Sequence, residues 1–246
     1  MTTTFSGSQY PPGRPAPVAA WWHTASVLGI LAAATIHGAM VASGAAPTGN
    51  AAPPTGSYVP GYVYSIGTEI GLAYYVWAGA HWSGKGLADL TGGRWTSFGQ
   101  MAADFAIAIP FWVVWEFTAR IVSNAVTHKV PDTYSYHVPS GAAEVFLWIL
   151  VSISAGFCEE LLFRGYLQRQ FQAATGSILV AVVLQGVIFG LLHSYKGWSQ
   201  VITITALGVL YGALVAWRRN LRASIIAHAW SDIYEGYVKF FWLGRP

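Results

Sequence analysis

The sequence predicts an all-α fold, a polytopic bundle of about seven transmembrane helices. Of the 246 residues, 54% are hydrophobic and only 9% are charged, whereas soluble domains carry about 25% charged residues. A chain so poor in charge cannot cover a water-exposed surface, and its 12 Trp and 13 Tyr fit two aromatic belts at the membrane interfaces. The apolar runs are continuous and do not alternate, so helices are expected to span the bilayer and a closed barrel is not.

Seven apolar stretches approach the roughly 20 residues that a helix needs to cross a bilayer. The fourth is the longest; its first half is apolar, its second half carries charge, and we expect it to leave the membrane near Gln168. The seven stretches cover residues 20–42, 62–82, 101–126, 141–171, 177–192, 198–217 and 222–241. We find no internal repeat and no second soluble domain.

Three segments follow from this pattern. Residues 1–19 form a polar tail rich in Pro, Gly, Ser and Thr, which we expect to be disordered. Residues 20–139 hold the first three spans and their loops, which we interpret as accessory. Residues 140–246 hold the remaining spans and all the motifs described below.

The basic residues bear on partners and orientation. The net charge of +3 is spread along the chain, which indicates loop charges beside a lipid bilayer and not a nucleic-acid-binding surface. With seven spans, eight of the 13 Lys and Arg, Arg164 among them, fall on the N-terminal side. The positive-inside rule then places the N-terminus in the cytoplasm. We expect a multi-pass integral membrane protein, in the plasma (inner) membrane if the chain is bacterial.

Three fragments place ionisable side chains inside apolar stretches. They are Glu159-Glu160-Leu-Leu-Phe-Arg164, Phe189-Gly-Leu-Leu-His193 and His228-Ala-Trp-Ser-Asp232. A charged side chain at the centre of a membrane helix costs at least about 2.5–3.5 kcal/mol. Their occurrence on three separate spans therefore indicates chemistry or transport and not packing.

The spacing within the fragments suggests roles. Arg164 follows Glu160 by four residues, which favours a structural ion pair on one helix face, while Glu159 points about 100° away and remains the reactive carboxylate. Alternatively, both acids merely bind Arg164 at a helix end. His228 and Asp232 share a helix face, so Asp232 either orients His228 or makes a polar contact between helices.

Such a set of side chains supports two kinds of hydrolytic chemistry. Glu159 and His193 can take the proton of a water molecule, and His228 can donate a hydrogen bond to a developing oxyanion. Alternatively, Glu159, His193 and His228 can bind zinc with an open position for water. No HExxH motif is present, so the common helical zinc-protease arrangement is absent, and the single cysteine, Cys158, excludes a cysteine-rich metal site.

In their order, the three fragments resemble the EExxxR, FxxxH and HxxxN/D signature of the CAAX-prenyl-protease and bacteriocin-processing (CPBP, or Abi) intramembrane endopeptidases. The resemblance covers roughly residues 140–241. It implies a protease with a membrane-embedded site, in which Glu159 and His193 activate water and His228 with Asp232 stabilises the oxyanion. Glu160 and Arg164 would support the site. It does not choose between zinc and no metal, and Asp232 stands where some members have Asn, so it is either protonated or holds His228.

The implied substrate is a membrane-associated protein or peptide, lipidated or with a transmembrane segment. Two alternatives stay open from the residues. The first is a proton- or ion-coupled transporter whose acids and histidines form a relay, although such folds often show paired repeats that this chain lacks. The second is a proteolytically inactive membrane scaffold of the same family.

Overall fold

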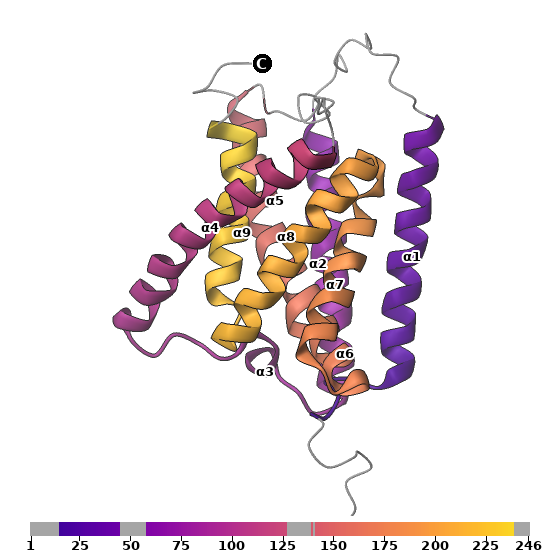
Figure 1. The fold of residues 1–246 in the computed structure, drawn as a ribbon, viewed down its shortest axis with the longest axis vertical. Helices are drawn as coiled ribbons and strands as arrows, with labels where there is room; N and C mark the ends of the chain where they lie inside the picture. The colour runs from indigo at the N-terminus through magenta and orange to yellow at the C-terminus, as the bar shows by residue number, and fades with distance from the viewer. Residues whose placement is uncertain (1–14, 45–57, 127–138, 140, 239–246) are drawn as a thin grey trace, which may run out of the picture.

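The computed structural model describes residues 15–44, 58–126, 139 and 141–238, and the regular elements among them are helices, with no strand (Figure 1). This confirms the predicted all-α bundle. In chain order the α-helices are α1 (Trp21–Gly44), α2 (Val59–Trp82), α3 (Leu87–Thr91), α4 (Phe98–Val126), α5 (Ala142–Glu160), α6 (Gln168–Thr175), α7 (Ile178–Leu192), α8 (Trp198–Arg218) and α9 (Arg222–Ile233).

Four helical stretches in the described part are long and apolar enough to cross a membrane. They are Trp21–Met40, Phe98–Val126, Ala142–Thr175 and Trp198–Arg218. Helix α7 is apolar but shorter, and α2 and α9 are not among the four. The count of about seven spans therefore stays a prediction for these three helices. The long helix of the fourth predicted span runs to Thr175, past the expected exit near Gln168. Most of the predicted tail, residues 1–14, lies outside the described residues.

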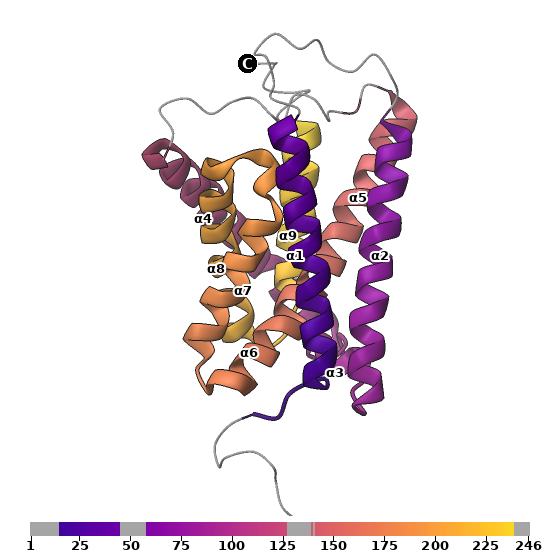
Figure 2. The same cartoon turned by 90° about the vertical axis from the view of Figure 1, so that its right-hand side faces the viewer.

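Helix α5 lies between two neighbours, α2 and α9, while α7 packs along α8 (Figure 2). Small residues allow these close contacts. A Cβ on Gly156 of α5 would lie 2.8 Å from the backbone nitrogen of Ala229 in α9, and a Cβ on Gly190 of α7 would lie 2.6 Å from the carbonyl oxygen of Val201 in α8. Gly186 and Gly190 form a GxxxG pattern, which lets membrane helices approach closely. The first contact joins two motif-bearing helices, α5 and α9, and the second joins the third, α7, to α8.

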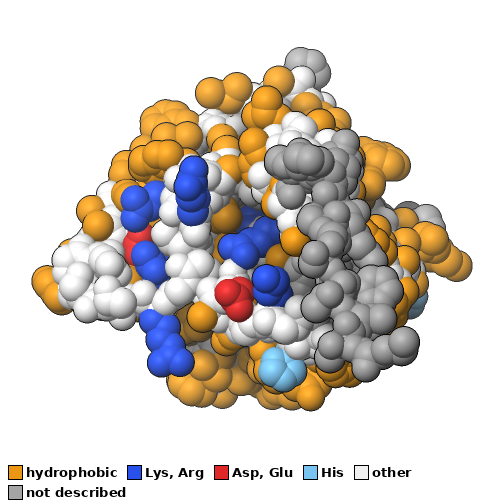
Figure 3. Space-filling model, turned by 90° about the horizontal axis from the view of Figure 1, so that it is seen from below, with side chains coloured by type: hydrophobic (Ala, Val, Ile, Leu, Met, Phe, Trp, Pro, Cys, Tyr) orange, Lys and Arg blue, Asp and Glu red, His pale blue; other side chains and the backbone are white. Residues whose placement is uncertain are grey.

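One end of the bundle carries a concentration of basic side chains (Figure 3). It is formed by the turn after α2, by α3 and the loop that follows it, by the end of the long α5–α6 helix and by the turn from α8 into α9. The Lys and Arg that these segments contribute are Lys85, Arg94, Arg169, Arg218, Arg219 and Arg222. Arg164, which the orientation count treated as a loop charge, is not on this face, because its side chain is fully buried in the core. That part of the count is wrong.

Candidate active site

A fully buried ion pair lies at the centre of the site. Arg164 Nη1 is 2.8 Å from Glu160 Oε1, and both side chains have no exposed surface. Arg164 also donates to the carbonyl oxygen of Gly208 in α8 and lies over the rings of Phe189 and Tyr211, 4.6 and 5.2 Å from their centroids. These contacts from α7 and α8 compensate the cost of burying the guanidinium group. The ion pair expected from the spacing is therefore present and ties three helices together.

The backbone between the two partners is not a regular α-helix. Leu161–Leu167 forms a π-helical segment, η2, directly after Glu160, and a second π-helical segment, η4 (Tyr234–Val238), follows α9 two residues beyond Asp232. Short π-helical insertions inside α-helices are rare and occur frequently at functional sites. Two of the three motifs thus lie next to this kind of backbone.

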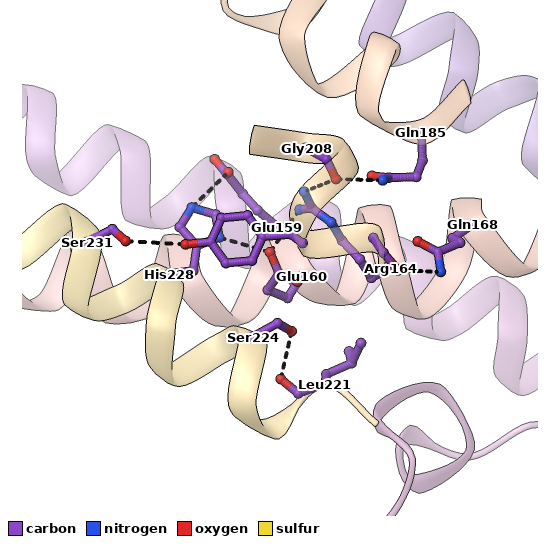
Figure 4. A network of polar contacts seen from close by, with 12 residues as sticks. Glu159, Glu160, Arg164, Gln168, Gln185, Gly208, Leu221, Ser224, His228 and Ser231 are labelled. Carbon is purple, nitrogen blue, oxygen red and sulfur yellow. Dashed lines mark hydrogen bonds and ion pairs between the residues drawn. The ribbon is translucent and has the colours of Figure 1, made fainter. Parts of the chain in front are cut away.

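His228 of α9 lies beside both acids of the first motif (Figure 4). It also lies near Asp232, one turn further along α9. Its Nδ1 lies 3.0 Å from Glu160 Oε1. Its Nε2 lies 3.6 Å from Glu159 Oε2 and 3.8 Å from Asp232 Oδ2. Because a carboxylate paired with arginine is an acceptor, Nδ1–H of His228 donates to Glu160 and Nε2 faces the other two acids. The group that orients His228 most closely is therefore Glu160, which is nearer than the expected Asp232.

Accessibility differs sharply among these acids. Glu160 is fully buried, whereas 22% of the Glu159 side chain and 37% of the Asp232 side chain are exposed. The His228 ring is 8% exposed and stacks on Tyr211 at a centroid distance of 5.1 Å. Tyr211 in turn is hydrogen-bonded to Ser231. The site thus has a closed polar interior and an open side formed by Glu159 and Asp232.

His193, which follows the last residue of α7, belongs to the same region but, in the described part of the chain, makes no hydrogen bond or ion pair with Glu159. Its Nδ1 donates to the carbonyl oxygen of Phe189 at 2.8 Å, which leaves Nε2 as the nitrogen that can face water or substrate. The Phe189 ring contacts both histidines edge-on, with centroid distances of 5.0 Å to His193 and 6.1 Å to His228. No hydrogen bond or ion pair joins His193 to Glu159 among the described residues. The two expected water-activating groups are therefore separate in this structure.

The proposed zinc ligands do not form a metal site in this arrangement. Within the described ranges, no group of three or more His, Cys, Asp or Glu side chains is placed to hold a metal ion. Glu159, His193 and His228 therefore do not fit a zinc ion as they stand, and we derive no step through one.

Glu69 of α2 is an acid next to the site that the motifs do not include. Ser154 of α5 donates a hydrogen bond to Glu69 Oε2, and Ser154 lies five residues before Glu159. Glu69 is close enough to interact electrostatically with Glu159, Asp232 and His228. In the sequence, Glu69 stands out only as an acid inside an apolar stretch, a position that favours a functional role.

Comparison with known families identifies the core that holds this site. Residues 141–234 match the family model described as type II CAAX prenyl endopeptidase Rce1-like, and all three motif fragments fall within this range. For these residues the match confirms the resemblance derived from the motifs, and it supports an intramembrane endopeptidase in general. No curated protein and no solved structure matches the chain. Helices α1 to α4 lie outside the matched range, so Glu69 of α2 reaches the site from outside the matched core.

Proposed function

We propose that this chain is an intramembrane endopeptidase of glutamate type, which hydrolyses a peptide bond in a membrane-associated or lipidated protein. The observation that carries the proposal is the pairing of Glu159 with His228. A partly exposed carboxylate lies 3.6 Å from a histidine whose other nitrogen is fixed by a buried ion pair.

The buried residues prepare His228 for oxyanion stabilisation. The contact from Nδ1 to Glu160 fixes the ring, and Arg164 fixes Glu160 in turn. At 3.6 and 3.8 Å, the distances from Nε2 to Glu159 and Asp232 are too long for hydrogen bonds. With Nδ1–H donating to Glu160, a proton on Nε2 makes His228 an imidazolium, and the three acids around it, Glu159, Glu160 and Asp232, balance that charge. Its Nε2–H group is then held in place without a closer acceptor. Such a preorganised donor is the element that stabilises a tetrahedral oxyanion, worth roughly 10²–10³ in rate.

Glu159 supplies the base. Its carboxylate takes a proton from a water molecule, and the hydroxide adds to the carbonyl carbon of the scissile bond while the oxyanion accepts from Nε2–H of His228. Glu159 then returns the proton to the amide nitrogen as the C–N bond breaks, so that a carboxylic acid and an amine leave. His193 accepts a hydrogen bond from the same water at Nε2, and Asp232 supports His228. Catalytic contacts often tighten only when substrate is bound, which accounts for the gap between Glu159 and His193 in the free enzyme.

Purified protein in proteoliposomes tests this proposal. A panel of quenched peptides, with and without a lipid chain, is assayed with wild type, Glu159→Ala and His193→Ala, each with and without a strong chelator, and metal content is measured on the same samples. We expect cleavage by wild type that ignores the chelator and is lost in both variants. Stoichiometric zinc with chelator-sensitive cleavage would overturn the glutamate mechanism.

A second assay separates the rival functions. If both variants cleaved membrane substrates as wild type does, the chain would not be a protease of this kind. Substrate-dependent proton flux into the same vesicles would then favour a transporter. If cells that carry Glu159→Gln showed the same phenotype as cells with the wild-type protein, that result would favour a scaffold.

A further inference from the structure

We propose that the groove between α4 and α9 binds an anionic phospholipid, with its phosphate at Arg218 and Arg222 and one acyl chain along the groove. This inference rests on the membrane location of the bundle and is independent of proteolysis.

The groove is apolar throughout. Its volume is about 270 Å³, and its lining exposes no polar surface. Ala108 and Ala227 form a buried floor, at 2% and 1% exposure, while Phe105, Ile109 and Trp230 rise beside them with 46%, 63% and 46% of their surfaces exposed. Ile226 completes the lining. A floor of small residues between bulky walls is shaped for an extended hydrocarbon chain.

The groove ends at a cluster of charged side chains. On α4, Asp104 precedes Ala108 by four residues; on α9, Arg222 precedes Ile226 by four. Residues four apart lie on the same helix face one turn, about 5.4 Å, from each other. Arg222 Nε lies 2.6 Å from Asp104 Oδ2, so the ion pair closes the groove one turn below its apolar lining. Figure 1 shows α4 tilted relative to the rest of the bundle, leaning outward toward this end.

The cluster carries more positive charge than its one acid neutralises. Arg218 and Arg222 share the single carboxylate of Asp104, at 2.9 and 2.6 Å. Asp104 is fully buried, whereas the two arginine side chains keep 25% and 16% of their surfaces exposed. Arg218 Nε is buried and has no hydrogen-bond partner, while Arg222 Nη1 donates to the carbonyl oxygens of Gly93 and Arg94. A phosphate oxygen arriving from outside would therefore meet guanidinium groups and not the acid.

The surrounding face carries the same sign. The segments that form it contribute the six Lys and Arg named above and one acid, Asp89, besides the buried Asp104. Lys and Arg side chains outweigh acidic ones on this face (Figure 3). Clusters of basic residues at the cytoplasmic end of membrane helices attract anionic lipid headgroups, at about 1 kcal/mol per cation. The cluster supplies the site for the phosphate and the groove supplies the site for the chain. A neutral lipid or a bare hydrocarbon chain would use only the groove.

Native mass spectrometry of the purified, delipidated full chain tests the inference. The protein is titrated with phosphatidylglycerol or with phosphatidylcholine of the same acyl chains, and the bound fraction is measured. We expect tighter binding of phosphatidylglycerol. Arg222→Gln should weaken its binding about fivefold, with little effect on phosphatidylcholine. Ile109→Gln, at an exposed groove wall, should weaken both lipids. Arg218→Gln replaces Arg222→Gln if that variant fails to fold.

Arg120→Gln is the matched control, since it removes the same charge from the opposite half of α4. It should bind both lipids as wild type does. Glu159→Gln should also bind as wild type does, which separates this inference from the proposed protease activity. Equal binding of the two lipids by wild type, or equal effects of Arg222→Gln and Arg120→Gln, would overturn the headgroup site. Unchanged binding in Ile109→Gln would overturn the groove.

Discussion

Glu160 in the core and Asp104 at the basic end of the bundle are both fully buried carboxylates that pair with arginine. Their surroundings differ. Asp104 accepts from Arg218, Arg222 and the indole Nε1–H of Trp95, and these contacts satisfy it. Glu160 accepts from Arg164 and from His228, and the second nitrogen of that histidine faces the partly exposed Glu159 and Asp232.

In the proposed mechanism, this difference separates a purely structural ion pair from one that orients the histidine of the site. Burial and pairing with arginine are common to both centres, so neither property identifies a reactive site. The distinguishing feature is a histidine held on one side by the buried pair and open on the other toward an accessible acid. Four substitutions sharpen this comparison.

Replacing Glu160 should cause the largest combined loss. Glu160→Gln leaves Arg164 buried without a counter-charge, which costs about 3–5 kcal/mol of stability, and it removes the acceptor that fixes His228. We expect a lower thermal midpoint and loss of cleavage, measured by thermal unfolding in detergent and by peptide hydrolysis. Full activity in a variant that folds would show that Glu160 is not required to hold His228 in its active orientation.

Replacing Asp104 should affect stability alone. Asp104→Asn weakens hydrogen bonds to two partly exposed arginines, with a loss of about 1.5–3 kcal/mol. The midpoint should fall while the cleavage rate per folded molecule stays at the wild-type level. A selective loss of cleavage would mean that the basic end takes part in catalysis.

Gly156 tests the contact that brings the two motif helices together. In Gly156→Ala the new Cβ would lie within 3.0 Å of Ala229, so α5 and α9 must separate. We expect a loss of about 1–3 kcal/mol, together with slower cleavage because His228 moves away from Glu159. Gly67→Ala in α2 is the control, since a Cβ there meets no atom within 4 Å. Equal behaviour of the two variants would refute the close contact.

The smallest effect is expected at Glu69. Glu69→Gln keeps an acceptor for Ser154 but removes an acid beside the site, so we expect a change of about 0.5–1.5 kcal/mol in activation free energy, up to about tenfold in rate. Hydrolysis rates at several pH values measure it. A hydrolysis rate identical to that of wild type across the pH range would show that Glu69 does not contribute to catalysis.

Much of this arrangement could be predicted from the sequence because it depends on short spacings. The ion pair between Glu160 and Arg164 could be predicted because the two residues are four positions apart on one helix. The apolar runs predicted most of the helices. The contact between Glu160 and His228 could not be predicted, since 68 residues separate them and it depends on how α5 packs against α9. The π-helical segment after Glu160 has no simple signature in residue type. The orientation count includes Arg164 among the charges on the N-terminal side because position along a span does not reveal which helix face is buried.

The most direct test of the central claim is the cleavage rate of Glu159→Gln in proteoliposomes, with the thermal midpoint measured on the same preparation. The substitution is nearly isosteric and the side chain is partly exposed, so the fold should persist. Removing the general base should lower the rate by about 10²–10⁴-fold at an unchanged midpoint. Cleavage at the wild-type rate in this variant would contradict the assignment of Glu159 as the catalytic carboxylate.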